Sequence, residues 1–82
     1  EILNTIPGIK ESACIGIPDP GVVLGEVVKA FVVADESLSN EDIMQQLRPR
    51  LEVYKLPVKI ERINEIPKTN SGKIQRMILK NR

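Results

Sequence analysis

Residues Val27 to Ala34 read Val-Val-Lys-Ala-Phe-Val-Val-Ala, and this stretch decides the fold. It is almost entirely apolar and rich in β-branched side chains, and Lys29 is its only charge. A run of this composition and length is typical of a strand that is central in a sheet or buried on both faces. Phe31 lies in its middle and is expected in the core. The other elements are therefore expected to assemble around this strand.

Local patterns predict further elements on both sides of this strand. Residues 1–6 carry apolar side chains on one helical face, and Pro7-Gly8 is expected to stop that helix. Residues 11–17 are predicted to form a strand that ends in the turn sequence Pro-Asp-Pro-Gly at 18–21. Residues 59–66 alternate weakly and are predicted to form a third strand at an edge of the sheet.

Helix signals follow residue 38. Ser39 is a good N-cap, and Asp42 occupies the capping-box position. The next apolar residues recur at helical spacing, namely Ile43, Leu47 and Leu51. Because Pro49 lacks a backbone donor and clashes with the preceding turn, the helix is expected to end near Arg48.

A short helix over residues 74–80 completes the chain, with Ile74, Met77 and Ile78 expected to face inward. The predicted order is α-β-β-α-β-α. This order favours the α+β class, with a small sheet of about three strands flanked by helices. With 82 residues, the chain is expected to form a single domain over residues 1–82.

Composition excludes several classes of protein. The chain has no histidine and one cysteine, so an internal Ser-His-Asp site, a Cys-His nucleophile, a histidine metal site and an intramolecular disulfide are excluded. No metal ligand set is expected. No apolar run is long enough to span a membrane, and the first residues do not resemble a signal peptide, so a cytoplasmic protein is expected. Cys14 lies in an apolar run and is expected to be an inert core residue.

The net charge of +1 hides an uneven distribution along the chain. Residues 1–47 hold two basic and eight acidic side chains, a net charge of −6, whereas residues 48–82 hold ten basic and three acidic ones, a net charge of +7. This split is compatible with an ordinary solvated surface. It is equally compatible with a C-terminal half that faces a phosphate-bearing ligand or another anion.

The segment 67–76 reads Pro-Lys-Thr-Asn-Ser-Gly-Lys-Ile-Gln-Arg and is the candidate for chemistry. Gly72 would allow close backbone approach, a following helix N-terminus would offer free amides, and Lys73 would add a mobile charge, all of which suit an anion. It is not a P-loop, because Pro67 and Ile74 occupy positions where that motif needs glycine and Ser or Thr. The residues alone leave an ordinary surface loop as the alternative.

This segment resembles the Pro-Lys-Thr-x-Ser-Gly-Lys-Ile-x-Arg signature of adenylate-forming enzymes, which include acyl-CoA synthetases, peptide-synthetase adenylation domains and luciferases. Three further segments resemble the family in matching order, namely Ile-Gly-Ile-Pro-Asp at 15–19, Gly-Glu-Val-Val-Lys-Ala-Phe-Val-Val at 25–33 and Leu-Glu-Val-Tyr-Lys-Leu-Pro at 51–57. The form Ser-Gly-Lys-Ile is more similar to acyl-CoA synthetases than to peptide synthetases. Residues 18–24 are slightly longer than usual for the family, and Pro49 interrupts its helix.

The resemblance implies the small, mobile C-terminal domain of an AMP-forming carboxylic acid:CoA ligase, without the hinge and the large N-terminal domain. Such an enzyme forms an acyl-adenylate from ATP and a carboxylic acid, and a thiol then takes the acyl group. The implied partners are the N-terminal adenylation domain, the acid, ATP and CoA, with Mg²⁺ in the full-length enzyme and no cofactor bound to this fragment. An acyl carrier protein is a further implied partner, and the isolated fragment is expected to be inactive.

The resemblance also implies roles for single residues. Lys73 matches the lysine of the adenylation half-reaction, where a mobile cation stabilises charge that develops in the transition state. Pro67, Thr69, Ser71 and Gly72 would shape its loop. Arg48 matches a position where some acyl-CoA synthetases have a basic residue near CoA. Arg76 fits a helix surface as well as an active site, whereas Tyr54 and Pro57 are expected in packing and turn positions.

Three alternatives remain at this point: an amino-acid adenylation domain, a domain that docks an acidic carrier protein, and a non-enzymatic module that binds a polyanion. Nucleic acid is not expected as a partner, because the chain has only two aromatic residues, Phe31 and Tyr54, on which bases could stack.

Overall fold

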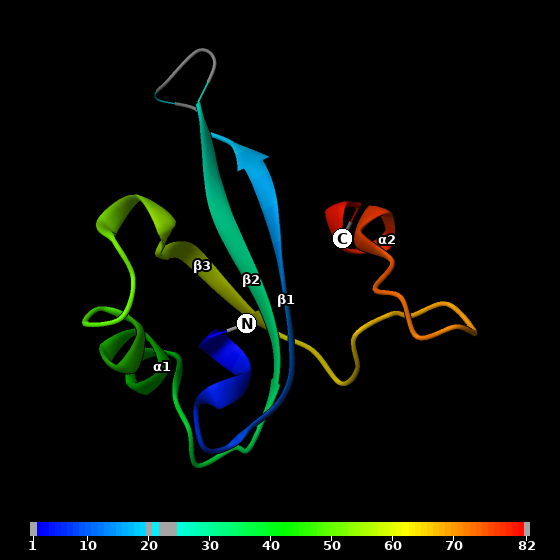
Figure 1. The fold of residues 1–82 in the computed structure, drawn as a ribbon, viewed down its shortest axis with the longest axis horizontal. Helices are drawn as coiled ribbons and strands as arrows, with labels where there is room; N and C mark the ends of the chain where they lie inside the picture. The colour runs from blue at the N-terminus through cyan, green and yellow to red at the C-terminus, as the bar shows by residue number, and fades with distance from the viewer. Residues whose placement is uncertain (1, 20, 22–24, 82) are drawn as a thin grey trace.

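A three-stranded sheet with short helices on both sides forms the domain (Figure 1). The computed structural model describes residues 2–19, 21 and 25–81. The elements in chain order are a 3₁₀ helix η1 (Ile2–Thr5), β1 (Ile9–Pro18), β2 (Glu26–Ala34), α1 (Asn40–Leu47), a second 3₁₀ helix η2 (Val53–Lys55), β3 (Pro57–Arg62) and α2 (Arg76–Lys80). The predicted α+β class and the three-stranded sheet are confirmed.

The sheet has the order β1-β2-β3, so the predicted central position of β2 is confirmed. β1 pairs with β2 in the antiparallel sense, with Ala13 opposite Phe31. β3 pairs with β2 in the parallel sense, with Ile60 opposite Ala30. Parallel neighbours need a crossover connection, and α1 and η2 lie in the connection between β2 and β3.

The sheet buries a separate core on each face. One core lies under η1 and α1 and consists of Leu3, Ile6, Ala30, Val32, Ile43 and Leu47. The other lies on the opposite face, under α2, and consists of Ala13, Ile15, Phe31, Ile66 and Leu79. Figure 1 shows α1 and α2 on opposite sides of the strands. Because successive side chains of a strand alternate between faces, β2 contributes to both cores, as its apolar composition predicts.

Helix α1 matches its prediction closely. The Ser39 hydroxyl accepts a hydrogen bond from the Asp42 amide at 3.1 Å, and the Asp42 carboxylate accepts one from the Ser39 amide at 3.1 Å. This is the predicted capping box. Ile43 and Leu47 are fully buried, and the helix ends with Arg48 as its C-cap.

The boundaries of other elements differ from the predictions. The first helix is a 3₁₀ turn of four residues, and β1 begins two residues earlier than expected. β3 ends at Arg62 instead of residue 66. Ile66 is nevertheless 4% exposed, because the chain beyond β3 turns it into the core beneath α2. The turn at 18–21 is described in part: the Gly21 amide donates to the Asp19 carboxylate, while residues 20 and 22–24 lie outside the described residues.

The predicted inward face of the C-terminal helix is wrong in two of its three residues. α2 begins at Arg76, and the buried residue is Leu79, 1% exposed, which the prediction did not include. Met77 and Ile78 are 72% and 49% exposed. Ile74 does pack against the core, but from the loop that precedes the helix. The prediction used the helical spacing from Ile74 to Ile78. Because the helix starts only at Arg76, that spacing does not apply, and a different side of the helix meets the sheet.

Three further predictions about packing and turn residues need correction. Tyr54 is 71% exposed and does not pack in the interior, because it lies on η2, where none of the residues is buried. Pro57 is buried and begins β3 instead of a turn. Cys14 is only partly buried, although it does pack against the core that lies beneath η1 and α1.

Candidate functional site

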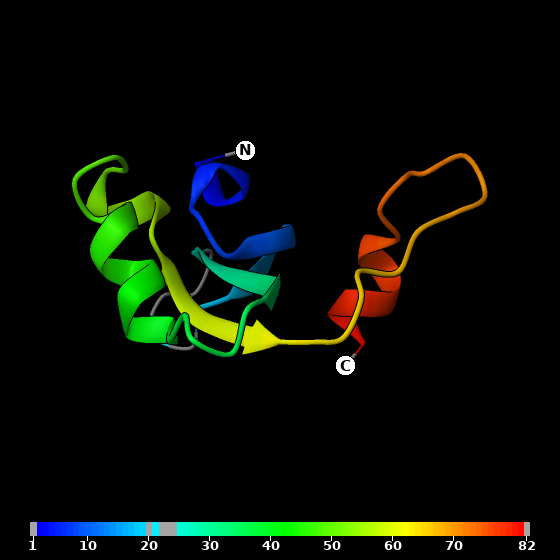
Figure 2. The same ribbon diagram turned by 90° about the horizontal axis from the view of Figure 1, so that it is seen from below.

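The loop between β3 and α2 is a small hairpin. The Gln75 amide donates to the Pro67 carbonyl at 2.8 Å, and the Thr69 amide donates to the Lys73 carbonyl at 2.8 Å. Between these bonds, Lys68 pairs with Ile74 in an antiparallel bridge. Residues 67–69 and 73–75 therefore form a stem, the lysine-loop stem. Figure 2 shows this hairpin projecting from the side of the domain.

The tip of the hairpin is a tight turn organised by Thr69. Its carbonyl accepts from the Gly72 amide at 2.9 Å, and its hydroxyl accepts from the Lys73 amide at 3.1 Å. The Ser71 hydroxyl lies 3.0 Å from the same Thr69 oxygen. Gly72 has φ of 87°, in the left-handed region that favours glycine, so the residue type at this position follows from the turn itself.

The helix that follows the loop begins three residues after Lys73. α2 starts at Arg76, and the amides of Thr69, Gly72, Lys73 and Gln75 donate to acceptors within the hairpin. These four amides therefore hold the shape of the hairpin, and Lys73 is presented by this turn.

The two lysines of the hairpin have different surroundings. The Lys68 ammonium forms an ion pair with the Glu11 carboxylate on β1. Lys73 is exposed, and no described residue forms a hydrogen bond or an ion pair with its ammonium group. Lys73 is thus the lysine that can meet an external anion without first breaking an internal contact.

Apolar anchors at both ends hold the hairpin to the sheet. Ile66 precedes it and Leu79 follows it, and both are buried against Phe31 in the same core. Ile74 adds a partly buried contact from the stem itself. The position of the lysine tip therefore depends on side chains that pack against β1 and β2.

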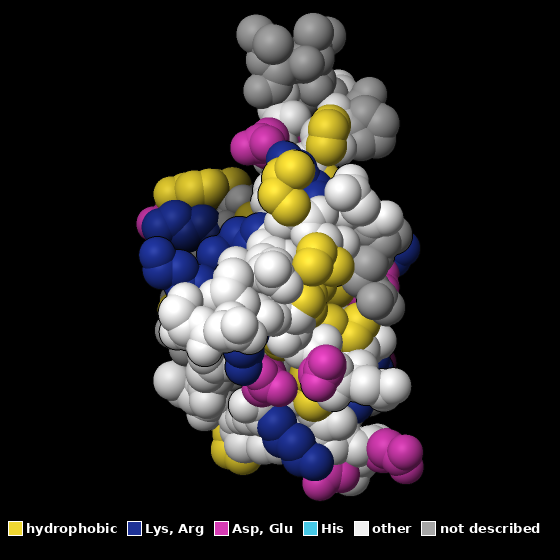
Figure 3. Space-filling model, turned by 90° about the vertical axis from the view of Figure 1, so that its right-hand side faces the viewer, with side chains coloured by type: hydrophobic (Ala, Val, Ile, Leu, Met, Phe, Trp, Pro, Cys, Tyr) yellow, Lys and Arg dark blue, Asp and Glu magenta, His cyan; other side chains and the backbone are white. Residues whose placement is uncertain are grey.

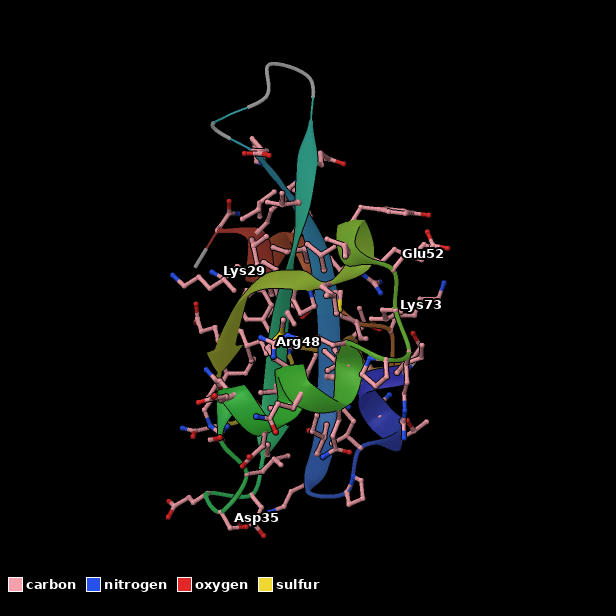
Figure 4. All side chains as sticks on the ribbon, turned by 90° about the vertical axis from the view of Figure 1, so that its left-hand side faces the viewer. Lys29, Asp35, Arg48, Glu52 and Lys73 are labelled. Carbon is pink, nitrogen blue, oxygen red and sulfur yellow. The ribbon has the colours of Figure 1, made fainter. Side chains whose placement is uncertain are left out.

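Arg76 and Arg48 lie outside this hairpin. The Arg76 guanidinium donates to the Cys14 carbonyl on β1 at 3.3 Å, next to a shallow groove between β1 and α2. Arg48 lies at the end of α1 and lines a groove of about 330 Å³ between α1 and β3. α1 and the hairpin stand on opposite sides of the sheet in Figure 1, and Figure 4 shows Arg48 and Lys73 on these separate elements. This domain alone does not bring Arg48 and Lys73 into one site.

The fold mixes the charges that are separated along the sequence. Lys68 from the basic half pairs with Glu11 from the acidic half, and Glu61 from the basic half pairs with Lys29 at 3.0 Å. Lys29 also lies over the Phe31 ring, 4.8 Å from its centroid. On the side that carries the hairpin and α2, basic and acidic side chains adjoin one another (Figure 3). This arrangement disfavours the polyanion-binding alternative, which needs a surface of one sign.

The described residues contain neither a membrane-spanning helix nor a cluster of metal ligands. No helix among them is long and apolar enough to cross a membrane. No group of three or more Cys, Asp or Glu side chains among them is placed to hold a metal ion.

Glu11 is the residue of this site that the sequence interpretation missed. It lies 57 positions from Lys68, so no local pattern connects the two side chains. An acidic residue at the start of the first strand and a loop with two lysines are visible in the sequence. Only the fold shows that these two segments lie side by side.

The fold and the hairpin together define a small α+β domain that presents an exposed lysine, Lys73, on a hydrogen-bonded hairpin. The family model for the AMP-binding enzyme C-terminal domain matches residues 1–73, which is most of the chain and includes Lys73. The chain belongs to this family.

Individual relatives agree with this assignment. The chain is 42% identical over 83 residues to the Bacillus subtilis protein YdaB, provisionally named an acyl-CoA ligase, in a match that covers 99% of this chain and 16% of YdaB. It is 42% identical over 81 residues to the human mitochondrial acyl-coenzyme A synthetase ACSM3, covering 90% of this chain and 14% of that protein.

Among solved structures, the fatty acyl CoA synthetase of Mycobacterium tuberculosis superposes with a TM-score of 0.87 at 37% identity, covering 98% of this chain and 16% of that one. The chain therefore spans about a sixth of the length of the relatives it matches.

Proposed function

We propose that this chain is the mobile C-terminal domain of an AMP-forming carboxylic acid:CoA ligase, and that Lys73 supplies the cation for the adenylation half-reaction. The observation that carries the proposal is the contrast between the two lysines of one hairpin. Lys68 is held by Glu11, whereas the Lys73 ammonium is exposed beside the turn of the hairpin and has no partner among the described residues.

The chemistry explains why a lysine is suited to this position. In the first half-reaction, a carboxylate oxygen attacks the α-phosphorus of ATP, a new P–O bond forms, and the bond to pyrophosphate breaks. Negative charge then grows on the oxygens of the attacked and leaving groups. A cation that approaches these oxygens in a closed, water-poor site stabilises the transition state more than the separated reactants.

The hairpin meets the structural requirements of that role. Its stem is closed by backbone hydrogen bonds and its ends are anchored by Ile66 and Leu79, so the tip can be presented as a unit. Preorganised charge is effective because little of the binding energy is spent on ordering the loop. In the second half-reaction, the CoA thiol attacks the acyl carbonyl and AMP leaves, and the domain would withdraw Lys73 by rotating.

ATP, CoA and Mg²⁺ would be used by the whole enzyme. The described residues offer no cluster of metal ligands, and no step of this mechanism is assigned to the metal. Arg48, exposed beside the groove between α1 and β3, is proposed to contact the nucleotide part of CoA. A cytoplasmic location stays a prediction.

The test uses the full-length enzyme that contains this domain. Lys73→Ala should lower acid-dependent ATP–pyrophosphate exchange by about 10²- to 10³-fold, by analogy with the loss of other charge-stabilising donors. Thioester formation from preformed acyl-adenylate should be retained. Lys80→Ala removes an exposed lysine of the same C-terminal segment and should leave both rates unchanged.

A second variant separates charge from shape. Lys73→Arg keeps the positive charge but replaces a compact ammonium with a planar guanidinium, so partial recovery of exchange is expected. Wild-type exchange in Lys73→Ala would refute the proposed role of Lys73.

A further inference from the structure

The ion pair between Glu11 and Lys68 joins β1 to the lysine-loop stem. Glu11 lies near the start of β1, and its side chain is 32% exposed, compared with 42% for Lys68. Among the described residues, this pair is the one side-chain polar contact between the hairpin at 67–75 and the sheet. The other contacts of the stem to the sheet are apolar.

Apolar contacts and an ion pair constrain the hairpin in different ways. Ile66 and Leu79 bury the two ends of the segment, which fixes where the chain leaves and rejoins the core, and Ile74 packs against the same core from one strand of the stem. The ion pair acts on the stem between these ends. Lys73 belongs to the other strand of the same stem, so any rotation of the stem also moves its ammonium group.

We propose that Glu11 is a positioning residue for adenylation: by holding Lys68 it sets the direction in which the hairpin presents Lys73. This inference rests on the proposed function of Lys73. Glu11 itself touches no reacting atom. A misplacement of about 1 Å is enough to lower the rate of a step that depends on geometry, even where stability is unaffected.

The expected signature is kinetic. Partly exposed ion pairs contribute little to folding, so removing this one should leave the domain folded. Glu11→Gln should lower kcat for acid-dependent ATP–pyrophosphate exchange by about three- to tenfold, with KM for ATP nearly unchanged, since the geometry of the transition state is affected more than ground-state binding. Thioester formation from preformed acyl-adenylate should be retained.

The decisive variants reverse the charges in the full-length enzyme. Glu11→Lys and Lys68→Glu should each lower exchange further than Glu11→Gln, because each places like charges together. The double variant restores an opposite-charge pair and should be faster than either single variant. If each substitution instead acted independently of the ion pair, the double variant would lose exchange activity by the product of the two single losses.

A matched control is available on the same sheet. Glu61→Gln breaks the ion pair with Lys29, which joins β2 to β3. It should leave exchange at the wild-type rate. Equal losses in Glu11→Gln and Glu61→Gln would overturn the proposal and assign the effect to general destabilisation.

The outcomes separate this proposal from the one on which it rests. Wild-type exchange in Glu11→Gln, together with inactive Lys73→Ala, would overturn the positioning role alone. Wild-type exchange in Lys73→Ala would overturn the proposed function, and the positioning role with it. Failure of the double charge reversal to exceed both single variants would also refute the ion pair as the cause.

Discussion

Leu79→Ala tests whether one side chain holds the C-terminal segment to the sheet. Leu79 is the only buried residue of α2 among its described positions, and it is 1% exposed. It packs in the core that includes Phe31 and Ile66. A helix of five residues has no stability of its own in water, so α2 depends on this contact.

The expected loss of unfolding free energy in Leu79→Ala follows from the burial of this side chain and from the shortness of α2. Truncating a buried leucine to alanine costs about 2–5 kcal/mol, as lost transfer energy plus the cavity left behind. Because α2 has five residues and Leu79 is its one buried residue among the described positions, we expect the lower part of that range, about 2–3 kcal/mol. A chain of 82 residues has roughly 4–12 kcal/mol in total, so the variant should remain folded.

Urea unfolding of the chain, with Met77→Ala as the control, measures this cost. Met77 lies two residues before Leu79 on the same short helix and is 72% exposed, so its truncation should cost less than about 0.5 kcal/mol. With a urea m-value on the order of 1 kcal/mol per M, Leu79→Ala should lower the midpoint by about 2 M. Equal midpoints for the two variants, or a larger loss for Met77→Ala, would refute the observed packing of α2.

Two further predictions concern the loop that leads into α1. Ser39→Ala removes the hydroxyl that accepts from the Asp42 amide and should cost about 1 kcal/mol in urea unfolding, whereas a change below about 0.2 kcal/mol would contradict the capping role. The Ser37 backbone amide and hydroxyl hold the pKa of the Asp35 carboxyl below its ordinary range, so its stabilising effect is present at neutral pH and is lost as the pH falls through the folded-state pKa. Ser37→Ala should raise that pKa in an NMR titration of the carboxyl carbon, and an unchanged value would exclude the hydroxyl as a cause.

The parts of the fold that could be predicted are those encoded by neighbours in the sequence. The capping box of α1 involves residues three positions apart, and the buried pair Ile43 and Leu47 lies one helical turn apart. The apolar run at 27–34 needs burial on both faces, which only the centre of a sheet provides. In each case the interacting groups are close along the chain, so their sequence spacing determines how they are placed relative to one another.

The parts that could not be predicted depend on distant residues. Which residue of α2 is buried was set by where the helix begins, and this start follows from the hairpin before it. The parallel pairing of β3 with β2 and the contact of Glu11 with Lys68 join residues far apart in sequence. The sequence identified Lys73 as the candidate cation through its motif, but the reason that Lys68 is not equivalent emerged only from the fold.

The register of the lysine-loop stem explains how one hairpin gives its two lysines different tasks. Lys68 and Ile74 are directly opposite each other in an antiparallel bridge, so their side chains lie on the same face of the stem. That face meets the sheet, where Ile74 packs against the core and Lys68 reaches Glu11. Because side chains alternate along a strand, Lys73, next to Ile74, is directed to the opposite face and stays exposed. The apolar residue beside the lysine therefore determines which ammonium group is bound internally and which is available for chemistry.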